Sequence, residues 1–265
     1  MKISNIEEAI NSLEIILEKT QTLSTETIFS IRYKCLMQIG SGSINFGDYA
    51  KALKIYNIAE EEIVANFSEP ELNLKLSSIY LNIGICYIYM NNPNIAEKYL
   101  RNALSKTEGM LGNEIIYKMH ADINENLGVA NEQIFKYKEA LNFYKKSLKT
   151  KFSLYGENKE EVLDLQYKIS NVYIMNKQYK EAEEIMTCMS DVILKEKLQS
   201  SSADMFYRYG AYFYSTGLVL LKNNKNILAK EYLNKALMIW RDILLKSDPV
   251  FVSIQNLLKI CEKSK

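Results

Sequence analysis

The sequence has few of the residues that interrupt or cross-link a fold. Among 265 residues there are 3 prolines, 10 glycines and 4 cysteines, and no stretch is rich in serine and glycine. Without such a stretch there is no obvious interdomain linker, so one continuous array is the simpler organisation. The cysteines lie far apart without metal-type spacing, and a chain of this length does not need a disulfide framework. We expect free thiols in a reducing compartment at Cys35, Cys86, Cys188 and Cys261.

The sequence also lacks an excess of charge and a long apolar run. Its 33 basic and 32 acidic residues create no global field toward nucleic acid or anionic lipid, so we expect neither partner. No apolar run reaches the roughly 18 residues of a membrane helix, because Asn82 breaks the longest candidate, and we expect no membrane insertion. Glu7 and Glu8 argue against a secretory signal or a mitochondrial presequence, so we expect a cytoplasmic location.

Residues that carry catalysis are scarce. His120 is the one histidine, and the sequence contains no Gly-rich phosphate loop, paired-carboxylate motif or nucleophile elbow. Asp122 and Glu125 follow His120 on the same predicted helix, but acids three apart are commonest on a solvated helix face. We therefore assign no catalytic residue, no metal ligand and no cofactor, and we expect the protein not to be an enzyme.

A ladder of small residues recurs five times along the chain. Each copy has a glycine or serine, here called the anchor, then an alanine 12 residues later and two further spaced positions. The alanines are separated by 44, 44, 42 and 47 residues. The copies are Gly40, Ala52, Tyr56, Ala59; Gly84, Ala96, Leu100, Ala103; Gly128, Ala140, Tyr144, Ser147; Ser170, Ala182, Met186, Met189; and Gly217, Ala229, Leu233, Ala236.

Apolar residues around these positions have helical spacing, so each copy predicts a pair of antiparallel helices. Helix A carries the anchor and helix B the alanine. We expect the glycine and the alanine to face each other where the helices cross, which lets the backbones approach closely. One pair cannot bury its apolar face without a stacked neighbour. The predicted A and B helices are 26–42 with 48–65, 71–90 with 94–109, 115–133 with 138–154, 160–176 with 179–197, and 203–222 with 226–246.

The two ends of the chain carry further helices. Residues 4–19 predict a B-like helix, with Ala9 in the alanine position. After Asp248 and Pro249 a last helix has Ile254 and Cys261 on one side and polar residues elsewhere, as in a capping helix. Head-to-tail stacking of the ends into a filament is an alternative to capping. We predict one domain over 1–265, divided into an N-terminal helix (1–24), five repeats (25–246) and a cap (247–265).

This pattern resembles the tetratricopeptide repeat. The closest stretches are YLNIGICYIYMNNPNIAEKYLRNAL (80–104) and QYKISNVYIMNKQYKEAEEIM (166–186). The long step resembles kinesin light chain repeats, and KSLKTKFSLYGENKEEV (146–162) is similar to their linker, although it lacks the His-Pro often found there. The resemblance implies an all-α, right-handed α-solenoid of five helix pairs with the two terminal helices added.

The resemblance also implies that A helices line a concave groove, with groove residues at fixed distances from each anchor. They are mainly apolar with two central acids, which suits an amphipathic helix or an extended apolar peptide that carries basic residues at its centre. The Lys and Asn arrangement of chaperone-binding members is missing. In the alternative, A-helix side chains bury each other and leave no open groove. The predicted groove residues are Met37, Leu81, Ile85, Ile88, Tyr89, Glu125, Val129, Glu132, Tyr167, Asn171, Ile174, Tyr214 and Leu218.

These features predict a protein that holds another protein or a peptide. The leading hypothesis is a non-enzymatic adaptor or assembly subunit, either a monomer or part of a larger assembly. The alternative is a regulatory receptor similar to the peptide-sensing tetratricopeptide proteins of bacteria. Most of the 19 tyrosines fall at repeat positions, where core packing accounts for them.

Overall fold

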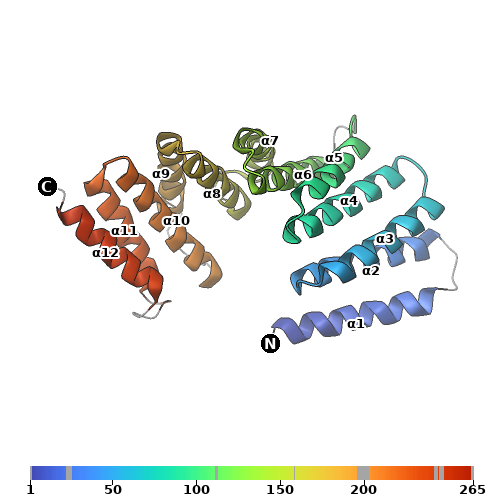
Figure 1. The fold of residues 1–265 in the computed structure, drawn as a ribbon. Coiled ribbons are helices and arrows are strands. Elements are labelled where there is room, and N and C mark those ends of the chain that lie inside the picture. Colours follow the sequence, from blue (N-terminus) through green and yellow to red (C-terminus); the bar gives the residue numbers. More distant parts are fainter. Residues whose placement is uncertain are drawn as a thin grey trace. The chain divides into compact units, whose positions relative to one another are not determined.

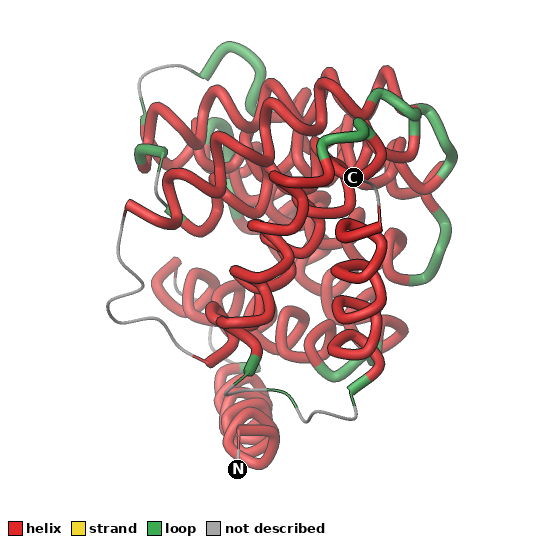
Figure 2. Tube along the Cα trace, turned by 90° about the vertical axis from the view of Figure 1, so that its left-hand side faces the viewer, coloured by secondary structure: helices red, strands yellow, loops and turns green. Residues whose placement is uncertain are grey.

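The computed structural model describes residues 2–21, 26–110, 113–157, 159–195, 203–241, 244 and 248–263, and within them it contains helices and no strand (Figures 1 and 2). The predicted helices are confirmed, with ends that shift by a few residues. Their bounds are α1 Lys2–Thr20, α2 Glu26–Asn45, α3 Tyr49–Asn66, α4 Glu71–Tyr89, α5 Pro93–Lys106, α6 Glu114–Gln133, α7 Tyr137–Tyr155, α8 Glu160–Met175, α9 Tyr179–Lys195, α10 Ala203–Lys222, α11 Asn226–Trp240 and α12 Pro249–Lys263.

Contacts group the chain into two compact units, here called unit 1 (1–147) and unit 2 (148–265). In unit 1 the pairs α2 with α3 and α4 with α5 are packed together, and in unit 2 the pairs α8 with α9 and α10 with α11. Consecutive pairs also touch, because α3 packs on α4, α5 on α6 and α9 on α10. Within each unit a repeat therefore buries its apolar face against the next, and the single domain over 1–265 stays a prediction.

The anchor glycines lie against the B helix of their own pair, and the nearest side chain there comes four residues after the alanine. A Cβ atom added at Gly128 would lie 2.4 Å from Cδ1 of Tyr144, and one at Gly84 would lie 2.7 Å from Cγ of Leu100. Tyr144 and Leu100 come 16 residues after their anchors, four beyond the alanine. The predicted close approach at the alanine is also found, because the same added atom at Gly84 would lie 3.5 Å from the carbonyl oxygen of Ala96. The anchor in addition makes room for a large side chain, and the alanines are buried beside it.

All five turns between helix A and helix B share one conformation. The residue seven places after the anchor has a positive φ in every copy, and its N–H donates to a carbonyl three residues earlier. The next N–H donates to a carbonyl five residues earlier, as Lys136 does to Asn131 at 2.9 Å. This is the Schellman ending, in which two otherwise orphaned carbonyls are satisfied. The left-handed residues are Gly47, Asn91, Phe135, Lys177 and Asn224.

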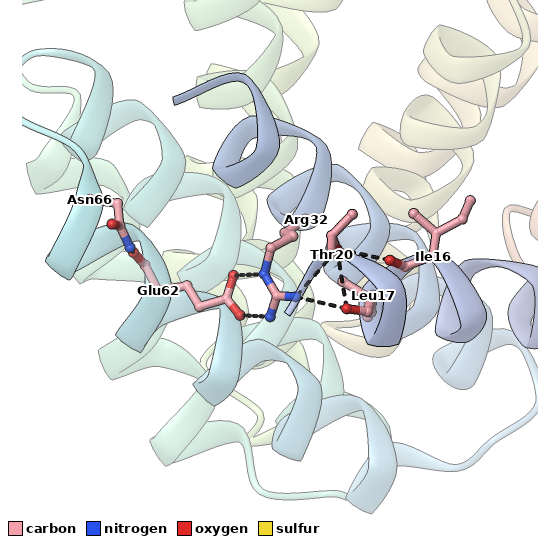
Figure 3. Close-up of polar contacts among 6 residues, drawn as sticks. All are labelled: Ile16, Leu17, Thr20, Arg32, Glu62 and Asn66. Atoms are coloured by element: carbon pink, nitrogen blue, oxygen red, sulfur yellow. Dashed lines mark hydrogen bonds and ion pairs between the residues drawn. The ribbon is translucent and has the colours of Figure 1, made fainter. Parts of the chain in front are cut away.

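The N-terminal helix α1 is fastened to the first repeat by one arginine (Figure 3). Arg32 of α2 donates from Nη1 to the carbonyl oxygen of Leu17 at 2.8 Å, and from Nε to Oε2 of Glu62 at 3.0 Å. A second bond from Nη2 reaches the other carboxylate oxygen of Glu62, which makes the pair bidentate. One guanidinium therefore joins α1, α2 and α3. The predicted alanine position at Ala9 lies outside the residues whose side chains are described.

The last helix, α12, has the predicted two-sided character. Ile254 is fully buried and Cys261 is 8% exposed, while Asn256 and Lys259 are exposed. Head-to-tail stacking stays an alternative to capping.

Candidate functional site

The predicted groove residues of unit 1 lie on A helices that are in contact, because α2 touches α4 and α4 touches α6. Helix α4 is apolar on two faces. Its core face holds Ile79 and Ile83, which are buried against the first repeat. Its second face holds Leu81 and Ile85, which are half-buried, and ends at Tyr89, which is 60% exposed. Leu81 packs against the core cluster that contains Leu100 and Leu127. Core packing therefore accounts for the first face of α4 and for Leu81, and leaves Ile85 and Tyr89 to be explained.

The predicted groove residues differ in exposure. Ile88 is 6% exposed and belongs to a core cluster with Ala96 and Leu100, so its side chain is not available on this face. Tyr89 is exposed and stacks on Tyr49, with ring centroids 5.4 Å apart. Those that are half-buried are Met37, Leu81, Ile85, Glu125, Val129, Glu132, Tyr167, Asn171, Ile174, Tyr214 and Leu218.

One of the two predicted acids of unit 1 is tied to a B helix. The hydroxyl of Tyr144 donates to Oε2 of Glu132 at 2.6 Å. Burial of Tyr144 raises the pKa of its phenol, and the carboxylates of Glu132 and Glu125 raise it further. A neutral hydroxyl satisfies one carboxylate oxygen without cancelling the charge, so Glu132 remains an acid held in a fixed position.

In unit 2 the hydroxyls of the predicted groove tyrosines are bonded within the protein. The Tyr167 hydroxyl lies 3.0 Å from Oγ of Ser215 on α10. The Tyr214 hydroxyl lies 3.0 Å from Oγ of Ser253 on α12. Tyr214 is therefore held by the capping helix, while Asn171, Ile174 and Leu218 are the other half-buried positions of this face.

The sequence analysis missed a charged cluster next to Tyr167. Arg208 of α10 lies 2.8 Å from Oδ2 of Asp164 and 2.5 Å from Oε1 of Glu160, both on α8. Tyr212 donates from its hydroxyl to the same Asp164, and burial followed by that bond raises the pKa of its phenol. The scarcity of arginine could have pointed to this cluster, because only four residues of the chain are arginines. Two of them link helices: Arg32 links three helices, and Arg208 links α8 to α10.

The remaining reactive side chains have structural surroundings. Nε2 of His120 lies 2.7 Å from Oγ1 of Thr107, between α6 and the end of α5, and burial lowers the pKa of its imidazole. Among the described residues, no group of three His, Cys, Asp or Glu side chains could hold a metal ion. In that same part of the chain no helix has the length and apolarity needed to cross a membrane.

Comparisons with known proteins agree with the repeat pattern. The tetratricopeptide repeat family matches residues 77–105. No curated protein matches the sequence. The structure is similar to that of BtubC (BKLC) from P. vanneervenii, with a TM-score of 0.75 and 18% identity, covering 90% of this chain and 92% of that one.

Two further solved structures are similar. One is a putative kinesin light chain from Podospora anserina with nearly identical TPR-like repeats (TM-score 0.64, 13% identity, 80% of this chain and 95% of that one). The other is a signal transduction ATPase from Pyrococcus horikoshii with a tetratricopeptide repeat sensor (TM-score 0.73, 13% identity, 93% of this chain and 35% of that one). Residues 77–105 therefore match the tetratricopeptide repeat family, and the helix pairs around them share the fold of these solved structures, the one with kinesin light chain-like repeats included.

Proposed function

We propose that the protein is a non-enzymatic adaptor or assembly subunit that holds a helical or extended apolar segment of a partner protein on the A helices of unit 1. The surface consists of Leu81 and Ile85 on α4 with Val129 and Glu132 on α6, and is here called the A face. Its apolar side chains would bury an apolar stripe of the partner, and Glu132 would pair with a basic residue beside that stripe.

The observation that carries this proposal is the second apolar face of α4. A helix on the surface of a soluble domain needs one apolar stripe for the core and carries polar residues elsewhere. In α4 the core stripe is complete, since Ile79, Ile83 and Cys86 are buried. Ile85 lies outside it and remains partly exposed, and Tyr89 at the end of the same face is 60% exposed, which a partner segment would relieve.

A second candidate function is a sensor that binds a short free peptide. It is favoured by the similarity to the Pyrococcus horikoshii protein, whose repeat region is described as a sensor. The two functions differ in what they bind. A sensor would bind a short peptide and become more compact, which small-angle scattering measures, whereas an adaptor would co-purify with a large assembly.

The test is affinity purification from the native source with Ile85→Asp. This substitution places a charge on the A face, and we expect the partner to be lost. The matched control is Ile95→Asp on α5, because Ile95 is 40% exposed and lies in the same unit but outside the A face. Circular dichroism establishes that both variants are folded. Equal partner yield from Ile85→Asp and the unmodified protein would refute the proposal.

A further inference from the structure

The outward side of the B helices carries a charge pattern that the near-neutral composition conceals. Three positions of each B helix, two, five and six residues after the buried alanine, point away from the core and are exposed or half-exposed in every copy. In chain order these triplets are Lys54, Asn57, Ile58; Lys98, Arg101, Asn102; Asn142, Lys145, Lys146; Glu184, Thr187, Cys188; and Glu231, Asn234, Lys235.

Positive charge is concentrated in the second and third triplets, on α5 and α7 of unit 1. The cations of these two triplets are Lys98, Arg101, Lys145 and Lys146, and their other members are neutral. In the fourth triplet the charged residue is instead Glu184. The concentration therefore belongs to two neighbouring repeats, and the rest of the chain compensates it to give a net charge of +1.

A buried aromatic ring brings the cations of the two helices together. Cζ of Arg101 lies 5.4 Å and Nζ of Lys146 lies 5.6 Å from the centroid of Phe143, whose side chain is 8% exposed. Arg101 comes from α5 and Lys146 from α7, so one ring holds a positive group from each helix. An anionic partner at this place would lie near a positive group from each of the two helices.

Arg101 also has an ion pair within its own helix that a carboxylate of a partner could replace. Its Nη2 lies 2.6 Å from Oε1 of Glu97, one turn earlier on α5, and the arginine side chain is 58% exposed. The Glu97 side chain is 18% exposed, and a pair one turn apart on a helix with an exposed arginine contributes little to stability. A partner carboxylate could therefore take the place of Glu97 and receive the two parallel bonds that a guanidinium offers.

We propose that this outward face of α5 and α7, formed by Lys98, Arg101, Lys145 and Lys146, binds an acidic segment of a partner protein. It is a second surface, distinct from the A face. The residues around the cations favour an acidic protein segment over a nucleic acid or a membrane. Exposed aromatic rings for stacking bases are lacking among its described residues, because Phe143 is buried. Asn102 and Asn142 lie where a membrane-binding face would carry large apolar residues.

The test measures binding of a fluorescent peptide with alternating glutamate and alanine, by anisotropy at physiological ionic strength. Arg101→Glu with Lys145→Glu should weaken binding at least about tenfold. The control, Lys54→Glu with Lys235→Glu, makes the same number of charge reversals in the first and fifth triplets and should change the dissociation constant less than about twofold. Circular dichroism and the milder pair Arg101→Gln with Lys145→Gln separate loss of binding from loss of folding.

Three results would overturn the proposal: no peptide binding, equal weakening by both pairs of charge reversals, or tighter binding of single-stranded DNA or phosphatidylserine vesicles than of the peptide. The A-face variant Ile85→Asp should leave the affinity for this peptide unchanged. Failure of the acidic-segment proposal is thereby distinguishable from failure of the proposed adaptor function.

Discussion

The A helices of the two units hold their carboxylates in different ways. In unit 1, Glu132 accepts a hydrogen bond from the neutral hydroxyl of Tyr144. In unit 2, Asp164 accepts one from Tyr212 and is also paired with the guanidinium of Arg208. A hydroxyl orients a carboxylate and leaves its charge, whereas a guanidinium cancels it. The same fold therefore holds an acid with a neutral phenol in one unit and uses an acid with a cation to join helices in the other.

Filling the space at an anchor glycine should cause the largest loss in the free energy of unfolding. In Gly128→Ala the new Cβ would lie 2.4 Å from the fully buried ring of Tyr144, and the ring could not move without disturbing its bond to Glu132. We expect a loss of about 2–3 kcal/mol in the free energy of unfolding, measured by urea denaturation followed by circular dichroism.

The matched change in unit 2 is Gly217→Ala at the anchor of the fifth copy, whose Cβ would lie 2.7 Å from Cγ of Leu233. Trp240 is the one tryptophan of the chain, so its fluorescence reports on unit 2. We expect a loss of similar size there. An unchanged urea midpoint for either variant would contradict the close packing of anchor and B helix.

Removing the guanidinium of Arg208 should destabilise unit 2, because two carboxylates lose their counter-charge. In Arg208→Ala, Glu160 and Asp164 lose their shared cation, and we expect about 1–2 kcal/mol less stability in the tryptophan-detected transition. Arg101→Ala is the control, because its ion pair with Glu97 lies within α5 and its mostly exposed side chain contacts the Phe143 ring of α7, which together should contribute under about 1 kcal/mol. Equal effects of the two substitutions would show that the ion pairs of Arg208 do not stabilise the packing of α10 on α8.

High pH should expose the role of the buried phenols. The pKa of Tyr144 is raised above its ordinary value of 10.0, mainly by burial. Since the unfolded chain ionises at the lower pH, the stability contributed by the neutral phenol is complete below pH 10 and falls as the pH rises further, by up to about 1.4 kcal/mol per pH unit for this group. Tyr144→Phe should lower stability by about 1 kcal/mol at neutral pH and make it less dependent on pH above 10.

The control for this titration is Tyr212→Phe in unit 2, since the pKa of Tyr212 is raised as well. Urea midpoints at several pH values measure both. If the phenylalanine variants lost stability with alkali as steeply as the unmodified protein, neither phenol would be the group that resists ionisation.

The smallest effect concerns the turns. Phe135 and Lys177 have left-handed backbones, with φ of 59° and 60°, at a position where the other copies have Gly or Asn. A side chain with a Cβ is strained there, so Phe135→Gly and Lys177→Gly should each stabilise the protein by about 0.5–1 kcal/mol. Thermal denaturation measures both. A loss on Phe135→Gly alone would mean that its ring, which lies 6.2 Å from that of Tyr137, supports unit 1.

The sequence allowed the helix pairs to be predicted because their signal is local. The ladder from Gly128 to Tyr144 spans one pair, and its spacing alone places the two helices. Side-chain contacts between helices carry no such local signal. That Tyr144 reaches Glu132, that Arg32 joins three helices and that Ile88 turns into the core depend on how helices rotate against one another, which a one-dimensional pattern does not record.

The most direct test of the central claim is photo-crosslinking in a lysate of the native source, with p-benzoylphenylalanine in place of Ile85 on the A face or of Asn66 at the end of α3. Both positions belong to unit 1, and Asn66 is exposed. If the A face holds a partner segment, position 85 gives a discrete crosslinked protein that a folded Leu81→Asp variant no longer captures, and position 66 gives none. Equal crosslinking at both positions, or capture that survives Leu81→Asp, would contradict the account.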